Sequence, residues 1–488
     1  MDRRTFLKAA GLGSVTFAYG CNPSQDKNLF SLVVAPEDMV TGKATFYAST
    51  CSECPAGCGV LAKNREGRII KLEGNPLHSI NKGKLCIRGQ SALQAVYDPD
   101  RLLTPKLKVN GSFKDIGFEQ AIDLLREKIQ KASAKGNRRI KMLSGVIGDS
   151  LLSVFTKSLG EWQSDAPVLY EPFSLDSLKA AHQALFSQSI LPSYHLDKAD
   201  LILGSGADFL ETWLSPVEYA QKFKKMHGVN DKHKGLYIHV GPFMSLTAAN
   251  ADKFISVKPG NEVVLALGII QTILRANNYS HLPEDFVDGL KSIVAKYNAS
   301  YVENNTGIKP ELQSSIAKRL LKAKRPLVLG GASPTDASLA LDLATAVINL
   351  LLDKELSLYA FDRRHAVEKV GTTSDVIDFF KDAATKPTDL CIFYHTNPLF
   401  TFPANQYLDK IFQNKDTFKV SFSNFLDETS ENSDLVFPIR LSLETWDVYA
   451  GTTDIVSTCQ PAMGQLTKAP QIGDVFIELT EQLQDFEN

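Results

Sequence analysis

Four cysteines in the first hundred residues have a spacing that fits metal binding. Cys51, Cys54 and Cys58 form a C-x2-C-x3-C triplet, and Cys86 follows after 27 intervening residues. Disulfides between cysteines this close together would restrict little chain entropy, and zinc sites usually use paired C-x2-C knuckles. A triplet with one distant cysteine is how four thiolates ligate a [4Fe–4S] cluster. The spacing therefore favours one [4Fe–4S] cluster, with a zinc site or two disulfides as the alternatives.

The residues around these cysteines suit a tight wrap of the backbone. Pro55, Gly57 and Gly59 lie within or beside the triplet, and Gly83 and Gly89 flank the distant cysteine. A compact loop of this kind turns backbone N–H groups toward the sulfur atoms, and such hydrogen bonds tune the potential of a cluster. We therefore expect the two cysteine segments to form one small module.

The chain after this module has the pattern of an α/β protein. Short apolar runs end in glycine, proline or a polar residue at 138–145, 199–206, 235–241, 325–331, 389–395 and 434–438. Most are separated by segments with helical periodicity, such as 118–130, 261–277 and 336–352. This alternation predicts parallel sheets covered by helices on both faces. Ligands in such sheets bind at the carboxyl ends of the strands, where the glycine-containing loops fall.

Size and charge limit the possible partners. A chain of 488 residues corresponds to about three domains. The formal net charge of −2 gives no electrostatic footprint for nucleic acid, so we expect no nucleic-acid partner. No apolar run approaches the roughly 18 residues that a membrane span needs.

The first residues predict export. Arg3 and Arg4 precede an apolar stretch from Ala9 to Tyr19, which is the layout of a signal peptide. The paired arginines fit the twin-arginine route, so residues 1–21 are expected to be a twin-arginine signal peptide. Cys21 follows small residues and is a possible site of lipidation. The expected location is the periplasmic face of the bacterial cytoplasmic membrane.

The cysteine array ending in LCIRG resembles the N-terminal iron–sulfur module of the molybdopterin oxidoreductases, the DMSO reductase family. In that family a basic residue two positions after the last cysteine lies between cluster and pterin, and Arg88 holds this position. Further similar segments follow in the same order at 143–150, 199–220, 245–262, 395–400 and 427–438. The resemblance implies an iron–sulfur module at 43–103, a discontinuous α/β domain at 104–165 and 353–465, and an inserted dinucleotide-like α/β domain at 166–352. The expected fold is thus a small module followed by two doubly wound α/β domains, with the family's C-terminal barrel absent.

Three features depart from the family pattern. The segment that supplies a metal ligand in active members contains no cysteine, and Ser174 is a weak candidate in its place. At the guanine-binding positions, Gly241 replaces an expected aspartate, and Asn261-Glu262 replaces the commoner Thr-Asp. The barrel that completes the second pterin pocket is not expected. Molybdopterin guanine dinucleotide is therefore a possible cofactor, but these departures argue against a working molybdenum centre.

Within the family, the chain looks most similar to the metal-free subunits of alternative complex III and menaquinone reductase complexes. That resemblance implies an electron-transfer subunit with three kinds of partner: a ferredoxin-like iron–sulfur subunit, a cytochrome c subunit and a polytopic quinone-binding membrane subunit. One alternative is a catalytic molybdopterin oxidoreductase acting on a small oxyanion, a sulfur compound or formate. Another is an assembly scaffold whose cysteines bind zinc or nothing.

Overall fold

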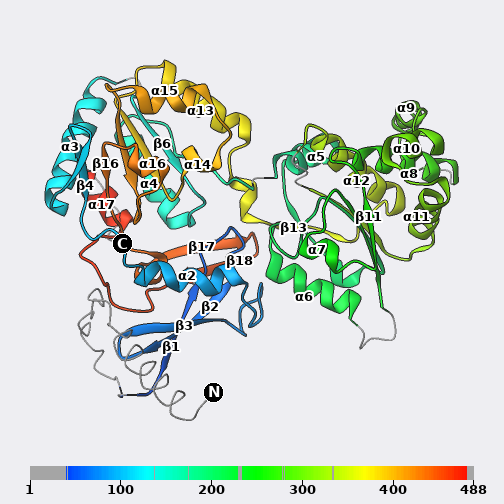
Figure 1. The fold of residues 1–488 in the computed structure, drawn as a ribbon, viewed down its shortest axis with the longest axis horizontal. Coiled ribbons are helices and arrows are strands. Elements are labelled where there is room, and N and C mark those ends of the chain that lie inside the picture. The colour runs from blue at the N-terminus through cyan, green and yellow to red at the C-terminus, as the bar shows by residue number, and fades with distance from the viewer. Residues whose placement is uncertain are drawn as a thin grey trace, which may run out of the picture.

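The structure is a computed structural model that describes residues 40 and 42–480, except 137, 174, 229–233, 277–278, 280 and 332–334. The expected signal peptide, the candidate lipidation site Cys21 and the candidate metal ligand Ser174 lie outside the described residues. Within the described part, no helix is both long and apolar enough to cross a bilayer. Figure 1 shows two α/β lobes, with a small β module at the base of one of them.

The N-terminal module is a three-stranded antiparallel meander with one helix. Strands β1 (Thr45–Thr50), β2 (Gly59–Arg65) and β3 (Arg68–Gly74) pair in sequence order. Helix α2 (Ile87–Tyr97) packs on β3 and buries Val96 against it. The side chains of Ala62, Ile69 and Leu72 complete this core with residues that return from the end of the chain.

The first lobe contains a seven-stranded sheet built from two distant parts of the sequence. The strand order is β5-β4-β16-β15-β14-β6-β7, and β6 pairs in parallel with β14. The bounds are β4 Lys106–Val109, β5 Ser112–Asp115, β6 Ile140–Ser144, β7 Val168–Leu169, β14 Leu390–Tyr394, β15 Phe418–Phe422 and β16 Leu435–Val436. Strands β4 and β5 form an antiparallel hairpin at one edge, and the remaining neighbours from β16 to β7 are parallel.

Helices cover both faces of this sheet. One face carries α3 (Phe118–Ala134), α4 (Asp149–Glu161) and α17 (Ile472–Leu479), whose buried Phe155 and Phe476 pack ring to ring. The other face carries α13 (Thr373–Thr385) and α15 (Gln406–Gln413), with Phe380 at the centre of its cluster. Short helices α14 (Pro398–Thr401) and α16 (Glu428–Glu431) follow β14 and β15 at the carboxyl edge.

The second lobe is built on a parallel four-stranded sheet of order β11-β10-β9-β12. Its strands are β9 Leu201–Ser205, β10 Leu236–Gly241, β11 Lys253–Ser256 and β12 Pro326–Gly330. One face packs on α8 Glu262–Ala276, α9 Glu284–Val294, α10 Ala299–Thr306, α11 Pro310–Lys322 and α12 Ser338–Leu352. The other face packs on α5 Asp176–Phe186, α6 Pro216–His227 and the antiparallel pair β8 Pro192–Tyr194 with β13 Tyr359–Arg364. Helix α7 (Leu246–Ala249) follows β10.

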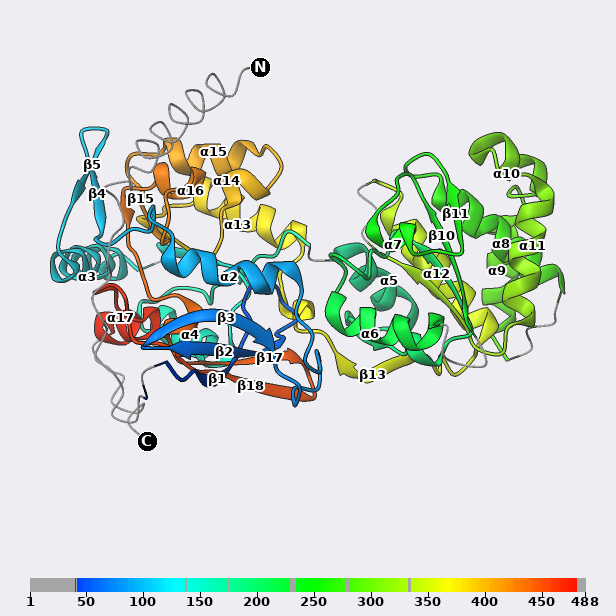
Figure 2. The same ribbon diagram turned by 60° about the horizontal axis from the view of Figure 1, so that its bottom comes forward.

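A hairpin near the end of the chain joins the module to both lobes. Strands β17 (Asp447–Thr452) and β18 (Ile455–Cys459) pair antiparallel, and Figure 2 shows them beneath β2. After the hairpin, Asn64 of β2 donates to the Ala462 carbonyl oxygen at 2.8 Å. The chain thus returns to the cysteine module after forming the first lobe.

The predicted fold class is confirmed. Each of the six predicted apolar runs contains a strand, and the three helical segments form α3, α8 and α12. The sequence analysis did not predict β11, β15 or the three-stranded sheet of the module. The domain boundaries as such stay a prediction, although residues on both sides of the second lobe share the seven-stranded sheet.

Candidate functional site

The structure brings the four cysteines of the array together. Cys51 follows β1, Cys58 precedes β2 and Cys86 is the residue before α2. The loop that carries the triplet is closed by a hydrogen bond from the Cys51 N–H to the Cys58 carbonyl oxygen at 2.8 Å. The side chains of all four cysteines pack in one cluster against Ala56, Ile80 and Val217, and Cys54 in the triplet loop is the fourth member.

Asn81 ties the two cysteine segments together. Its side-chain oxygen accepts from the Gly59 N–H at 3.0 Å, and its amide donates to the carbonyl oxygens of Gly59 at 2.8 Å and Lys84 at 2.6 Å. The residue is completely buried. Because Gly59 adjoins Cys58, these bonds fix the end of the triplet relative to the segment that leads to Cys86. Asn81 was not among the residues predicted from the sequence.

Glycines allow close approach around the cysteines, as expected. Gly57 and Gly83 have φ of +61° and +84°, in the left-handed region that side chains disfavour. A Cβ at Gly89 would lie 3.3 Å from the Cys51 sulfur, so the first turn of α2 lies directly against this thiol.

The chemistry of the four thiols fits a cofactor that brings positive charge. Burial raises the pKa of Cys51 to about 12 and also raises the pKa of Cys58. The neighbouring Cys54 and Cys86 add to the effect on Cys51 through repulsion between thiolates. Four adjacent thiolates are therefore unfavourable unless metal ions compensate them, and metal coordination deprotonates a thiol. The donor set suits an iron–sulfur cluster.

Among the described residues, no three His, Cys, Asp or Glu side chains converge on a position for a single metal ion. A [4Fe–4S] cluster does not require such convergence, since each thiolate binds a different iron. The assignment of Cys51, Cys54, Cys58 and Cys86 as its ligands stays a prediction.

Arg88 lies in the first turn of α2 and reaches across to the second lobe. Its Nη2 donates to the Glu211 carbonyl oxygen at 3.1 Å. Burial raises the pKa values of Glu53 and Glu171, and the charge of Arg88 lowers both. The guanidinium therefore lies among carboxyl groups next to the cysteine segments.

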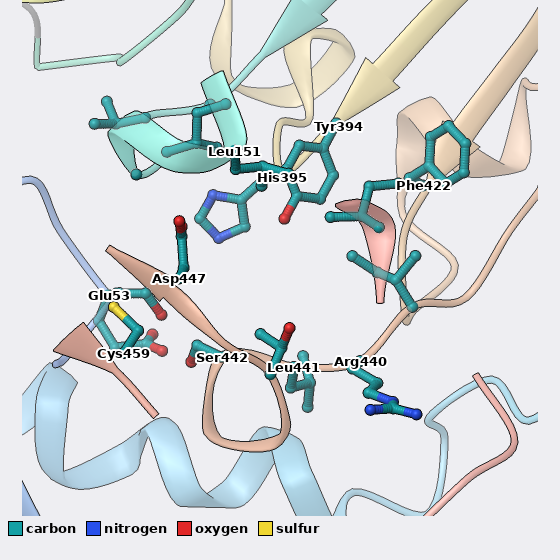
Figure 3. A pocket seen from close by; sticks show the side chains of 18 of the residues that line it. Glu53, Leu151, Tyr394, His395, Phe422, Arg440, Leu441, Ser442, Asp447 and Cys459 are labelled. Atoms are coloured by element: carbon teal, nitrogen blue, oxygen red, sulfur yellow. The ribbon is translucent and has the colours of Figure 1, made fainter. Parts of the chain in front are cut away.

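A cavity of about 720 Å³ lies between the cysteine module and the carboxyl edge of the first lobe's sheet. Its lining comes from the triplet loop at 50–55, the turn at 145–148 after β6 and the residues 395–397 after β14. The segment 439–449 forms another wall (Figure 3). The glycine-containing loops thus surround a cavity at the predicted edge of the sheet, and Cys51 and Cys54 line it too.

His395 occupies a strained position at this edge. Its φ is +51°, and its carbonyl oxygen and ring lie so close to Gly145 that a Cβ there would be 2.2 Å from the oxygen. The imidazole points into the cavity toward Asp447 (Figure 3). Desolvation at the wall of the cavity lowers the pKa of His395 below its usual range. Strained residues of this kind often mark functional sites.

The wall at 439–449 is held by a buried ion pair. The Arg101 guanidinium makes two hydrogen bonds to the Glu444 carboxylate, at 3.2 and 2.5 Å. Glu444 also accepts from the backbone N–H groups of Leu441 and Leu466. These contacts occupy the carboxylate of Glu444, which therefore supports the cavity wall from behind.

The residues at the positions expected to bind guanine are part of the second lobe and are placed by contacts within it. Gly241 ends β10, and the Asn261 side chain donates to the Asn305 carbonyl oxygen at 2.7 Å. Glu262 begins α8 and is buried, and this burial raises its pKa. The structure thus places the three residues at the carboxyl side of β10 and at the start of α8.

A cysteine module beside a cavity at the edge of a parallel sheet is the architecture of an iron–sulfur oxidoreductase. The sequence model of the molybdopterin oxidoreductase Fe4S4 domain matches residues 44–98, and that of the molybdopterin oxidoreductases matches 101–482. The second match covers most of the chain. The chain belongs to the molybdopterin oxidoreductase family.

Relatives of this chain include subunits of respiratory enzymes. It is 26% identical to the molybdopterin-binding-like subunit of menaquinone reductase from Nitratidesulfovibrio vulgaris, over 99% of this chain and 72% of that protein. It is 28% identical to the molybdopterin-containing subunit of arsenate respiratory reductase from Shewanella sp., over 59% of this chain and 35% of the relative. Acetylene hydratase from Pelobacter acetylenicus has a similar structure, with a TM-score of 0.71, 17% identity and coverage of 88% of this chain and 68% of the hydratase. The last likeness is one of fold.

Proposed function

We propose that the chain is an exported electron-transfer subunit of a membrane-bound, quinone-linked respiratory complex. It carries one [4Fe–4S] cluster on Cys51, Cys54, Cys58 and Cys86, and no molybdenum centre of its own. The observation that carries the proposal is the packing of all four cysteine side chains in one cluster, with Cys58 buried and the other three partly buried, within the segment that matches the Fe4S4 domain.

The residues of the module would act by positioning and charge. When bound, the cluster supplies one-electron redox chemistry. Asn81 and the closed triplet loop hold the thiolates, and Ile80 and Val217 cover one side of the cysteine cluster. The charge of Arg88 favours the reduced, more negative state of the site. No bond to a substrate forms or breaks in this role.

The relative named as a subunit of menaquinone reductase supports a multisubunit complex, and we propose three partners in it. They are a ferredoxin-like iron–sulfur subunit, a cytochrome c subunit and a polytopic quinone-binding membrane subunit. The proposed location is the periplasmic face of the cytoplasmic membrane. The twin-arginine pattern at residues 1–21 supports it, because that route exports proteins already folded around a cofactor. A lipid on Cys21 would add an anchor.

A second candidate is a catalytic molybdopterin oxidoreductase acting on a small oxyanion, a sulfur compound or formate. The match over residues 101–482 and the cavity beside Cys51 favour it. The charged residues that line the cavity do not fit the dinucleotide cofactor, because acidic side chains outnumber basic ones and would repel its phosphates.

Elemental analysis of the complex purified from native membranes tests the proposal. About four irons and four acid-labile sulfides per chain, without molybdenum or tungsten, are expected. Cys58→Ser should lower the iron content and change the electron paramagnetic resonance spectrum of the reduced protein. Cys459→Ser is the matched control, because this thiol is buried but lies outside the cluster of four. Stoichiometric molybdenum or tungsten would instead support the catalytic alternative.

A further inference from the structure

The cavity beside the cysteine module has a lining rich in carboxyl groups. Among the described residues that line it, Arg440 is the one lysine or arginine, and five are acidic: Glu53, Glu171, Asp427, Asp447 and Asp474. The Arg440 guanidinium is already engaged, since it donates to the Gln465 side-chain oxygen at 2.6 Å and the Ala469 carbonyl oxygen at 3.2 Å. Arg88 lies near Glu53 and Glu171, so a phosphate entering this cavity would meet charges of its own sign mainly on the side of Asp447.

One of these carboxylates lies at the start of a helix. Asp447 is the first residue of β17, and a Cβ at Gly148 would lie 2.3 Å from its Oδ2 and 2.5 Å from its Oδ1. Glycine at 148 therefore permits this approach. Burial raises the pKa of Asp447, and the Val448 N–H donates to its Oδ1 at 2.8 Å. In Figure 3 its carboxylate points into the cavity between Glu53 and His395.

The amino end of a helix is where proteins bind phosphate groups, because unpaired N–H groups and the helix dipole favour negative charge there. Helix α4 has 13 residues and begins at Asp149, directly after Gly148. Its amino end opens on the cavity, where Gly148, Ser150 and Leu151 line the wall. In this chain the carboxylate of Asp447 already lies against that turn, next to Gly148.

We propose that Asp447 is a specificity-determining residue, whose carboxylate fills the anion position at the amino end of α4 and makes the cavity reject phosphate-bearing ligands. A guanine dinucleotide cofactor is among the ligands rejected. This inference rests on the proposed function and deepens it, since it gives a physical reason for a member of this family to carry a cluster without the dinucleotide.

Binding of guanosine 5′-diphosphate and of uncharged guanosine, measured by titration calorimetry on the purified full chain, tests the inference. Asp447→Asn keeps the shape and the acceptor oxygen and removes the charge. Wild type should bind the diphosphate with a dissociation constant weaker than about 1 mM. The variant should bind it at least about tenfold more tightly, because a like charge next to the phosphates is gone. Affinity for guanosine should not change.

Asp474→Asn is the matched control. Asp474 also lines the cavity, but it is exposed and accepts from the Gln471 amide at 3.1 Å. This variant removes the same charge without touching the turn before α4, so it should bind the diphosphate within about twofold of wild type. Asp447→Ser serves as a second replacement if Asp447→Asn does not fold.

Three results would overturn the inference. They are sub-millimolar diphosphate binding by wild type, an equal gain in Asp474→Asn, and an equal gain for guanosine and its diphosphate in Asp447→Asn. The wild-type measurement decides by itself if no variant folds. The metal content of the native complex tests the proposed function separately, so a failure of one can be told from a failure of the other.

Discussion

The ring of Tyr449 lies where a side chain on Gly57 would have to stand. A Cβ at Gly57 would come within 2.7 Å of two ring carbons of Tyr449, and the tyrosine hydroxyl donates to the Pro55 carbonyl oxygen at 2.8 Å. The hairpin β17–β18 thus shapes the loop that carries three of the four cysteines, although nearly four hundred residues separate the two in sequence.

Gly57→Ala should therefore destabilise the module and lower its iron content. Left-handed backbone at a non-glycine residue costs about 1–3 kcal/mol, and crowding against the ring adds about 1–3 kcal/mol. Urea unfolding and iron analysis measure the two effects. Gly111→Ala is the control: Gly111 has φ of +83° with no atom within 4 Å of an added Cβ, so it reports backbone strain alone. Equal losses in the two variants would show that the contact with Tyr449 does not matter.

Asn81→Ala should release the cysteine segments from each other. Three hydrogen bonds of a fully buried amide disappear, and the Gly59 N–H and the Lys84 carbonyl oxygen lose this partner, while the Gly59 carbonyl oxygen keeps the Asn75 N–H at 2.9 Å. Each buried group left unpaired costs about 1–3 kcal/mol. We expect a clear fall in iron per chain and a broadened cluster spectrum. Asn64→Ala removes a buried amide bond to Ala462 in the same module. That control should lose stability and keep its iron, and full iron in Asn81→Ala would refute the positioning role.

Arg88→Gln should lower the reduction potential of the cluster. Burial raises the pKa of Cys54, and the charge of Arg88 is among the effects that lower it, so the field of the guanidinium reaches this thiol. Loss of about 1 kcal/mol of charge–charge interaction corresponds to about 40 mV. Arg88→Lys keeps the charge and should keep the potential within about 10 mV. Redox titration followed by electron paramagnetic resonance measures both, and an unchanged potential in Arg88→Gln would rule out the electrostatic role.

The sequence predicted those features that depend on local pattern. The strands β6, β9, β10, β12 and β14 are mainly apolar runs, because both faces of their sheets are covered, although Lys141 interrupts β6 and His239 interrupts β10. Strand β15 was missed, since Lys419 and Ser421 alternate with its three apolar residues. In the structure, the Lys419 ammonium group is buried and pairs with Asp434 and two backbone carbonyl oxygens. Only the fold supplies those partners.

The candidate site divides in the same way. The cysteine array and its glycines could be recognised from the sequence, because they lie in two short segments with a characteristic spacing. Asn81, Tyr449 and Asp447 act on residues far away in the sequence: Asn81 on Gly59, Tyr449 on Pro55 and Asp447 on the turn before α4. No periodicity or spacing reports such contacts. The residues that shape the loops and the charge of the cavity therefore became visible only in the structure.

Asp342→Asn should stabilise the second lobe at alkaline pH. Asp342 lies in α12 and is fully buried with no hydrogen-bond partner for either carboxyl oxygen, and burial raises its pKa to about 7. Between the model-peptide value of 3.8 and 7, the folded chain keeps a proton that the unfolded chain loses. Wild-type stability therefore falls as pH rises through this window, by up to about 1.4 kcal/mol per pH unit. The side-chain amide of the Asp342→Asn variant does not titrate in this window, so the variant does not lose this stability.

Urea unfolding of the two proteins at pH 5 and pH 8 measures this difference, and the advantage of Asp342→Asn over wild type should grow by about 1–3 kcal/mol between them. Asp353, at the carboxyl end of the same helix, is the control. Burial raises its pKa, but hydrogen bonds from Ser357 and Glu355 outweigh this effect and lower it. Asp353→Asn should therefore destabilise the lobe at both pH values. If the advantage of Asp342→Asn were the same at pH 5 and pH 8, the carboxyl group would not be held in its protonated form by burial.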